Sequence, residues 1–188
     1  ATSGSRIRVR VFGGWDFSAD DVERQDFADR GYAGGVPMGG DLSAAPADKP
    51  PTFLIRALRD PDNANLDRIQ VSKGWLKADG ETEERIFDVA CADDRAIVDR
   101  RCERPVGNTV DVADASYTNT IGDPLLTAYW EDPEFDPGQR AFYYVRVLEI
   151  PKPSWQAYDA KFYGVEMPDE VPMTVQDRAY TTPIWYTP

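Results

Sequence analysis

The sequence contains no histidine, two cysteines, three methionines and far fewer basic than acidic residues. Without histidine, His-ligated metal sites, Ser-His-Asp and Cys-His catalysis and a histidine pH switch are excluded within this chain. The 21 Lys and Arg residues against 33 Asp and Glu give a formal net charge of -12. That charge argues against binding to nucleic acid or an anionic membrane. No apolar run approaches the length of a membrane span.

The composition is that of a globular protein. Hydrophobic residues make up 41% and charged residues 29% of the 188 positions, which is enough for one hydrophobic core. The length predicts a single domain over residues 1–188. The chain begins Ala1-Thr2-Ser3-Gly4 with no leader-like segment, so we expect either a removed leader or a piece of a longer polypeptide. The last residues, 182–188, resemble a terminal strand of a C-terminal domain.

Alternation of apolar and polar residues predicts a succession of short strands. The predicted strands cover residues 6–11, 52–59, 66–77, 84–90, 108–112, 116–121, 125–131, 140–150 and 179–186. Residues 125–131 could instead form a helix that begins at Asp123-Pro124, but their alternation favours a strand. The segment 140–150 is apolar on both faces and is therefore predicted to be central, and Asp79-Gly80 predicts a hairpin. With no βαβ rhythm, the pattern predicts an all-β fold: an antiparallel, immunoglobulin-like β-sandwich with one or two short helices and long loops.

Two helices are expected. The first starts at an N-cap Ser18 with Asp21 three residues on, and we expect Gly31 to end it. A long irregular loop is then predicted over residues 31–51, which are rich in Gly, Pro and Ala. The second helix covers 154–163, followed by Gly164.

Cys91 and Cys102 bracket a polar loop, and we predict that they form a disulfide. Such a clip would add roughly 3 kcal/mol of stability by the chain-entropy model and would place the protein in an oxidising compartment. The alternative is two unpaired thiols in a cytosolic protein. A metal site made of cysteine alone is not expected from two thiols.

Two acidic segments could carry chemistry. Residues 60–67 are rich in oxygen ligands suited to calcium, although the Gly and terminal Glu of an EF-hand loop are missing. Residues 131–137 contain carboxylates that could act in acid–base chemistry or bind metal. In both segments Asp, Asn and Pro are also typical of rigid turns, which is the interpretation that we favour.

Other motifs favour structural roles. The row of Arg6, Arg8 and Arg10 could bind anions, but a solvated face with acidic neighbours is the better interpretation in an acidic chain. The Gly-Gly pairs lack the Lys-Ser/Thr of a phosphate loop. Five Trp and nine Tyr could form a sugar-binding platform, but their helical and alternating positions favour the core.

Several segments together carry a resemblance that spans the chain. They are VFGGWDF (11–17), GVPMGGDL (35–42), ALRDP (57–61), ANLDRIQV (64–71), KGWL (73–76), GNTVD (107–111), FDP (135–137), AFYYVRV (141–147) and AYTTPIWY (179–186). In these motifs the sequence resembles the C-terminal part of the bacterial "domain of unknown function 3604" family. The first residues, Ala1 to Arg6, resemble the seam at which an upstream barrel ends.

The resemblance implies a relative of the PHP-type metal-dependent phosphoesterases. In that family the expected metal site lies upstream, in a His-rich barrel with a Gly-Asp-Leu-His-type motif, and this chain lacks that motif. The resemblance therefore assigns no catalytic, cofactor-binding or metal-ligating residue to this chain, and its partner would be the upstream barrel of the same polypeptide. Many members carry an export signal, which implies a periplasmic or secreted protein.

Two hypotheses follow. The first is a non-catalytic accessory C-terminal domain of an exported hydrolase, packed on the barrel through the loop 31–51 and the acidic turns. The second is a stand-alone carbohydrate- or calcium-binding module. An exposed apolar patch would favour the first, and exposed coplanar Trp or Tyr in a groove the second. A self-sufficient enzyme is disfavoured, because the sequence offers no convincing carboxylate pair.

Overall fold

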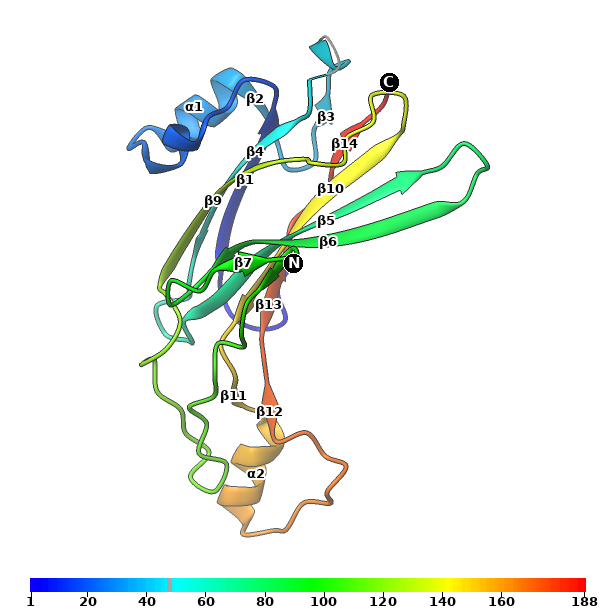
Figure 1. The fold of residues 1–188 in the computed structure, drawn as a ribbon. Helices are drawn as coiled ribbons and strands as arrows, with labels where there is room; N and C mark the ends of the chain where they lie inside the picture. The colour runs from blue at the N-terminus through cyan, green and yellow to red at the C-terminus, as the bar shows by residue number, and fades with distance from the viewer. Residues whose placement is uncertain (47–48) are drawn as a thin grey trace.

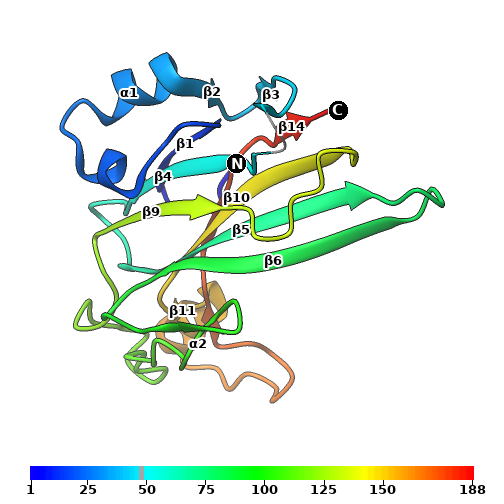
Figure 2. The same ribbon diagram turned by 45° about the horizontal axis from the view of Figure 1, so that its top comes forward.

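Two β-sheets pack face to face in the computed structural model, which describes residues 1–46 and 49–188 (Figures 1 and 2). The first sheet has the order β2-β1-β4-β9. Its strands are β1 (Arg8–Gly14), β2 (Gly35–Pro37), β4 (Thr52–Leu58) and β9 (Leu125–Glu131). All of its pairings are antiparallel.

The second sheet has the order β3-β14-β10-β5-β6, and β13 also pairs with β10. Its strands are β3 (Asp41–Leu42), β5 (Leu66–Leu76), β6 (Thr82–Cys91), β10 (Ala141–Glu149), β13 (Arg178–Tyr180) and β14 (Ile184–Tyr186). The β14–β3 pairing is parallel and the others are antiparallel. The predicted all-β, sandwich-like fold is confirmed, with two short α-helices beside the strands.

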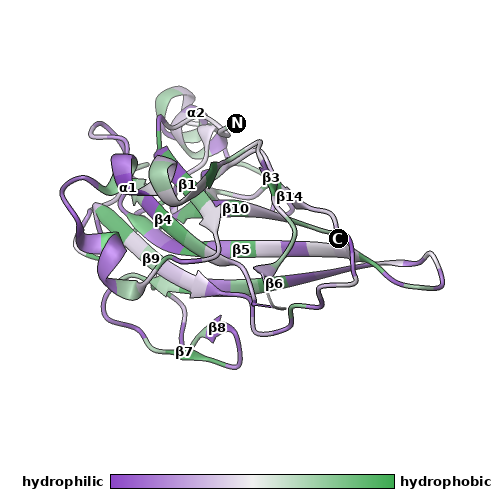
Figure 3. Cartoon of the chain, turned by 90° about the horizontal axis from the view of Figure 1, so that it is seen from above, coloured by the Kyte–Doolittle hydropathy of each residue, from purple (hydrophilic) through white to green (hydrophobic). Residues whose placement is uncertain are grey.

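The core lies between the two sheets. Phe53 and Ile55 of β4 face Val71 of β5 and Val145 of β10, and all four are almost fully buried. β10 pairs with β5 on one side and with β13 and β14 on the other, so the predicted central strand is confirmed. Hydrophobic and hydrophilic residues succeed one another in bands along the strands (Figure 3), as expected where one face meets the core.

The chain alternates between the sheets. β1 and β4 pair in the first sheet, β5 and β6 form a hairpin in the second, β9 returns to the first, and β10 crosses back to lie beside β5. The hairpin turns at Gly80, whose positive φ of 87° suits glycine, as the Asp-Gly signal predicts. Figures 1 and 2 show this hairpin projecting beyond the neighbouring strands.

The predicted helix from Ser18 to Gly31 is wrong in extent. A 3₁₀ turn, η1 (Ala19–Glu23), precedes a separate helix, α1 (Phe27–Gly34). Ser18 does begin η1, and its backbone N–H donates to the Asp21 carboxylate at 2.9 Å. Gly31 lies inside α1. A Cβ at this position would come within 2.3 Å of the Phe12 ring, so only glycine fits. Close packing of α1 on the first sheet, and not helix termination, explains this glycine.

Two other local predictions are wrong. The segment 31–51 is not one irregular loop: part of it forms the end of α1, β2 and β3, while residues 47–48 lie outside the described part of the chain. Residues 108–112 and 116–121 form a loop instead of strands, with one isolated bridge between Asp111 and Ser116. The predicted strand 179–186 is divided into β13 and β14.

A small lobe lies at the end of the sandwich opposite α1 (Figure 1). It contains β11 (Lys152–Pro153), α2 (Trp155–Tyr163) and β12 (Thr174–Val175). α2 starts after Ser154 and ends at Gly164 in the left-handed conformation, as predicted. In the described residues, no helix is long and apolar enough to cross a membrane.

Candidate functional site

The exposed aromatic face of α2 is the most conspicuous unpartnered surface of the described chain. Trp155, Phe162 and Tyr163 leave 69%, 80% and 69% of their surfaces exposed, and Tyr158 is also exposed. We call these four residues the α2 face. Their helical spacing predicts core packing, and that expectation is wrong for this helix.

The physical reason is the position of Ala157. At 100° per residue, Ala157 lies on the side of the helix opposite Trp155 and Phe162. Ala157 is fully buried, so the helix packs through its smallest side chain and turns its largest side chains outward. The sequence signal that could have shown this is the pair of alanines, Ala157 and Ala160, opposite a broad aromatic stripe.

Contacts hold α2 in place. The Ser154 backbone N–H donates to the Met173 carbonyl at 3.0 Å, and Lys161 Nζ lies 2.7 Å from the Asp114 carboxylate. A small core cluster next to this lobe contains Ala64, Val106 and Ile150. The α2 face is therefore presented by an anchored element, which lowers the ordering cost of binding a partner.

A groove opens on the outer surface of the second sheet. Its volume is about 520 Å³, and it lies between the projecting β5–β6 hairpin and the ends of β10 and β14. Phe142 and Trp185 line it, with ring centroids 5.4 Å apart and planes inclined by 52°. The groove thus contains an exposed Trp185 and a half-buried Phe142, although these two rings are tilted and not coplanar.

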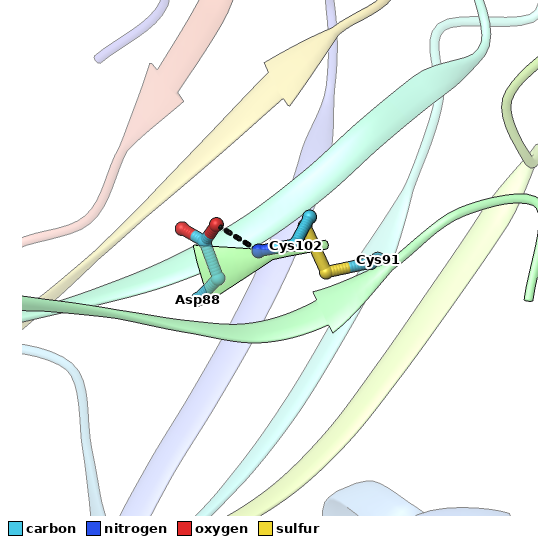
Figure 4. A group of neighbouring side chains, drawn as sticks. All are labelled: Asp88, Cys91 and Cys102. Carbon is cyan, nitrogen blue, oxygen red and sulfur yellow. Dashed lines mark hydrogen bonds between the residues drawn. A yellow bond between two sulfur atoms is a disulfide. The ribbon is translucent and has the colours of Figure 1, made fainter. Parts of the chain in front are cut away.

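The predicted disulfide between Cys91 and Cys102 is present. The Sγ–Sγ distance is 2.00 Å, and the bridge ties the end of β6 to the short hairpin of β7 (Ile97–Val98) and β8 (Arg101–Cys102). In Figure 4 the Asp88 carboxylate lies beside it and accepts the Cys102 backbone N–H at 2.9 Å. Asp88 and the two cysteines lie close enough together to suggest a metal site. The disulfide leaves no thiolate, however, so this group does not fit one.

The carboxylates of the first acidic segment have protein partners. Arg6 Nε lies 3.1 Å from the Asp60 carboxylate, and these hydrogen bonds hold the pKa of that carboxyl below its ordinary value. Asp67 is buried against Arg95 at 2.6 Å. Asp60 and Asp67 are thus paired with arginines, which supports turn formation and ion pairing here. Arg6 also meets acidic neighbours, as expected for a solvated face.

The second acidic segment is equally committed to the fold. Asp132 is buried, lies 2.6 Å from Lys73 Nζ and accepts a hydrogen bond from the Tyr143 hydroxyl at 2.8 Å. Burial, reinforced by the Asp132 charge, raises the pKa of Tyr143. Glu134 pairs with Arg85 and Arg100. The structure therefore uses these groups to join β5, β9 and β10, and both Asp132 and Glu134 are paired with basic side chains.

A third cluster of charged side chains, around Glu149, was not predicted from the sequence. Neither carboxylate oxygen of the fully buried Glu149 has a hydrogen-bond partner among the described residues. Burial raises its pKa, and Lys152 Nζ lies 3.4 Å away. Lys152 is closer to Asp177, at 2.5 Å. Burial opposes ionisation of Asp177, but hydrogen bonds from Lys152 and Ser3 outweigh it and lower its pKa. This cluster joins β10 to the lobe that carries α2.

Together these features define an all-β, sandwich-like domain stapled by one disulfide and carrying an exposed aromatic helix. The chain belongs to the family described as "Protein of unknown function (DUF3604)", whose sequence model matches residues 1–188. The resemblance seen in the sequence is thereby confirmed. No curated protein and no solved structure matches the chain.

Proposed function

We propose that this chain is a non-catalytic accessory C-terminal domain of an exported, PHP-like metal-dependent hydrolase. In this proposal the chemistry belongs to a His-rich barrel upstream in the same polypeptide. The chain contributes a surface that packs on that barrel and stabilises it. The observation that carries the proposal is the α2 face, an anchored cluster of aromatic side chains with no partner in the described chain.

The size and composition of the α2 face support a protein partner. Exposed aromatic clusters on soluble proteins mark interaction sites, and Trp and Tyr are enriched where binding energy concentrates. The expected contact differs from the one proposed from the sequence. The acidic turns are engaged within the chain, and much of 31–51 is held by α1, β2 and β3. We therefore propose that the chain contacts the barrel through the α2 face.

The connectivity supports an immunoglobulin-like assignment within the sandwich class. The orders β1-β4-β9 and β14-β10-β5-β6 have the arrangement of strands A-B-E and G-F-C-C′ in such domains. The disulfide differs from the inter-sheet bridge of antibody domains, because Cys91 and Cys102 clip one loop at the end of β6. We propose an immunoglobulin-like fold with its own disulfide position.

The disulfide also supports the proposed location. Disulfides persist in oxidising compartments and are rare in the cytosol of mesophiles. Cys91 and Cys102 are both consumed by the bridge, and no free cysteine is present in the described residues. We propose a periplasmic or secreted protein.

Metal-dependent phosphoesterase activity, measured on the longer polypeptide and on residues 1–188 side by side, tests the accessory role. We expect activity in the longer protein alone. A Trp155→Ser/Phe162→Ser double variant of the longer protein should keep its activity at 25 °C. On heating, it should lose that activity at a lower temperature than wild type does. Tyr32→Ser, an exposed aromatic change on α1 at the opposite end, is the control and should behave as wild type. Activity in residues 1–188 alone would overturn the proposal.

A further inference from the structure

One row of residues runs straight across the outer face of the second sheet. In the strand register, Gly74 of β5 lies opposite Glu84 of β6 on one side and Phe142 of β10 on the other. Phe142 in turn lies opposite Trp185 of β14. Four adjacent strands thus present a carboxylate, a bare backbone, a phenyl ring and an indole ring in order. These four residues are called the Glu84–Trp185 row below.

Gly74 explains how the phenyl ring is placed. A Cβ at this position would lie 2.3, 2.5 and 3.1 Å from three atoms of the Phe142 ring. The ring therefore occupies the space above the backbone of β5, and any other residue would displace it. Because it rests on the sheet, the ring forms an aromatic floor between Glu84 and Trp185.

The groove over this floor has the make-up of a ligand site. Its volume of about 520 Å³ falls within the roughly 300–1,000 Å³ typical of small-molecule pockets. Trp185 is 47% exposed along one side. Polar residues complete the lining, namely Thr82, Glu83, Glu84, Arg140 and Thr187. The Glu84 carboxylate shares a face with Phe142, whereas Glu83 lies opposite Trp75 and pairs with Lys77. An aromatic floor with acceptors and donors at its edge suits a ligand that is apolar on its face and hydroxylated around its rim.

We propose that the Glu84–Trp185 row binds a neutral pyranose sugar. The C–H face of the sugar ring would stack on Phe142 and Trp185, and its hydroxyl groups would donate to the Glu84 carboxylate and accept from Arg140. The net charge of -12 and the Glu84 carboxylate of the groove disfavour polyanionic ligands. A ligand without charge avoids that repulsion and still uses the hydrogen-bonding rim.

The aromatic surface continues beyond the groove. The ring centroid of Tyr144 lies 6.3 Å from that of Phe142, and the two rings are nearly parallel. The ring centroid of Tyr180 lies 6.4 Å from that of Tyr144. A linear oligosaccharide could contact several of them, so binding should strengthen with chain length. The site is separate from the α2 face, and the two proposals fail independently.

Isothermal titration of residues 1–188 tests the site. The probes are cellohexaose, xylohexaose, mannohexaose and laminarihexaose, with a hexamer of polygalacturonic acid as the charged comparison. We expect one neutral hexaose to bind at a one-to-one ratio. Trp185→Ala should weaken it at least about tenfold, and Glu84→Gln roughly fivefold, because a neutral acceptor bonds less strongly than a charged one.

Trp155→Ala is the matched control, since it removes an exposed indole from the α2 face. Its affinity should equal that of wild type. Trp155 is 69% and Trp185 47% exposed, and neither belongs to the buried core, so the variants should fold, and thermal melts of each would verify this. Three results would overturn the proposal: no binding of any neutral hexaose, tighter binding of the polyanion, or unchanged affinity in Trp185→Ala.

Discussion

Buried ion pairs connect distant segments of this chain. The clearest case is Arg95, which donates to the Asp67 carboxylate at 2.6 Å while its other guanidinium hydrogens reach the carbonyls of Ala92 and Arg104. Both charged side chains are 1% exposed. Arg95 therefore fixes the disulfide-bridged loop to β5, and the acidic composition alone gave no sign of this role.

Removing this guanidinium should be costly, because among the described residues the buried Asp67 carboxylate then keeps only the partly exposed Arg68 and the Gln176 amide as partners. Arg95→Met is expected to lower the free energy of unfolding by about 3–5 kcal/mol. Arg101→Met, at an exposed position of the same loop, is the control and should cost less than about 1 kcal/mol. Urea unfolding of both variants measures the difference. Equal losses would contradict the assigned role of Arg95.

Glu149 predicts a pH dependence of stability. Burial raises the pKa of this carboxyl above its ordinary value of 4.5, so the folded state binds the proton more tightly than the unfolded state. Its ionisation therefore lowers stability as the pH rises from about 4.5 through the folded-state pKa. Asp177 has the opposite sign, since its lowered pKa stabilises the fold above the ordinary 3.8.

Glu149→Gln removes the ionisable group and keeps the shape. The stability of the variant minus that of wild type should be larger at pH 8 than at pH 5, because only wild type loses stability when Glu149 ionises. Urea unfolding at the two pH values provides the comparison. A difference between the two proteins that does not vary with pH would contradict a buried, ionising Glu149.

At the scale of elements, long regular segments were predictable and short ones were not. β5, β6 and β10 show clear alternation or a doubly apolar pattern, and their predicted extents agree with the structure to within a few residues. β2 and β3 have three and two residues, too few for a period to show. Their pairing with β1 and β14 depends on contacts between distant segments, which the local sequence does not encode.

The wrong strands at 108–112 and 116–121 have a local cause. Thr109 and Thr118 bond to each other through side chain and backbone, and Asp111 caps a turn by accepting the Asp114 N–H. Such side-chain bonds compete with strand pairing. Tyr117 and Ile121 pack on the cluster beside the α2 lobe, so their apolar character reflects that small core and not a sheet.

The disulfide acts at the scale of one loop, with a sequence separation of 11 residues. Replacing both cysteines by serine should lower the free energy of unfolding by about 3 kcal/mol, because the unfolded loop regains its freedom. Reductant should destabilise wild type by a similar amount and leave the double variant unchanged. Intact mass should rise by two hydrogens on reduction. Wild type that is insensitive to reductant would contradict the bridge.

At the scale of the whole molecule, the core and the two proposed binding surfaces lie on different parts of the sandwich. The two sheets enclose the main core, α1 covers the outer face of the first sheet through Phe12 and Phe27, and the Glu84–Trp185 row lies on the outer face of the second. The α2 face lies on the lobe at the end opposite α1 (Figure 1). The alternation of apolar and polar residues, without a βαβ rhythm, predicted the sandwich. Apart from the aromatic stripe of α2, which aromatic residues remain outside the core could be read only from the folded structure.

The central claim is that the α2 face is covered in the longer polypeptide. Hydroxyl-radical footprinting with mass spectrometry, applied to residues 1–188 and to the longer protein, tests it most directly. We predict that Trp155 and Phe162 react at least several-fold more slowly in the longer protein, while Tyr32 on α1 reacts equally in both. Equal reactivity of Trp155 and Phe162 in the two proteins would contradict the claim.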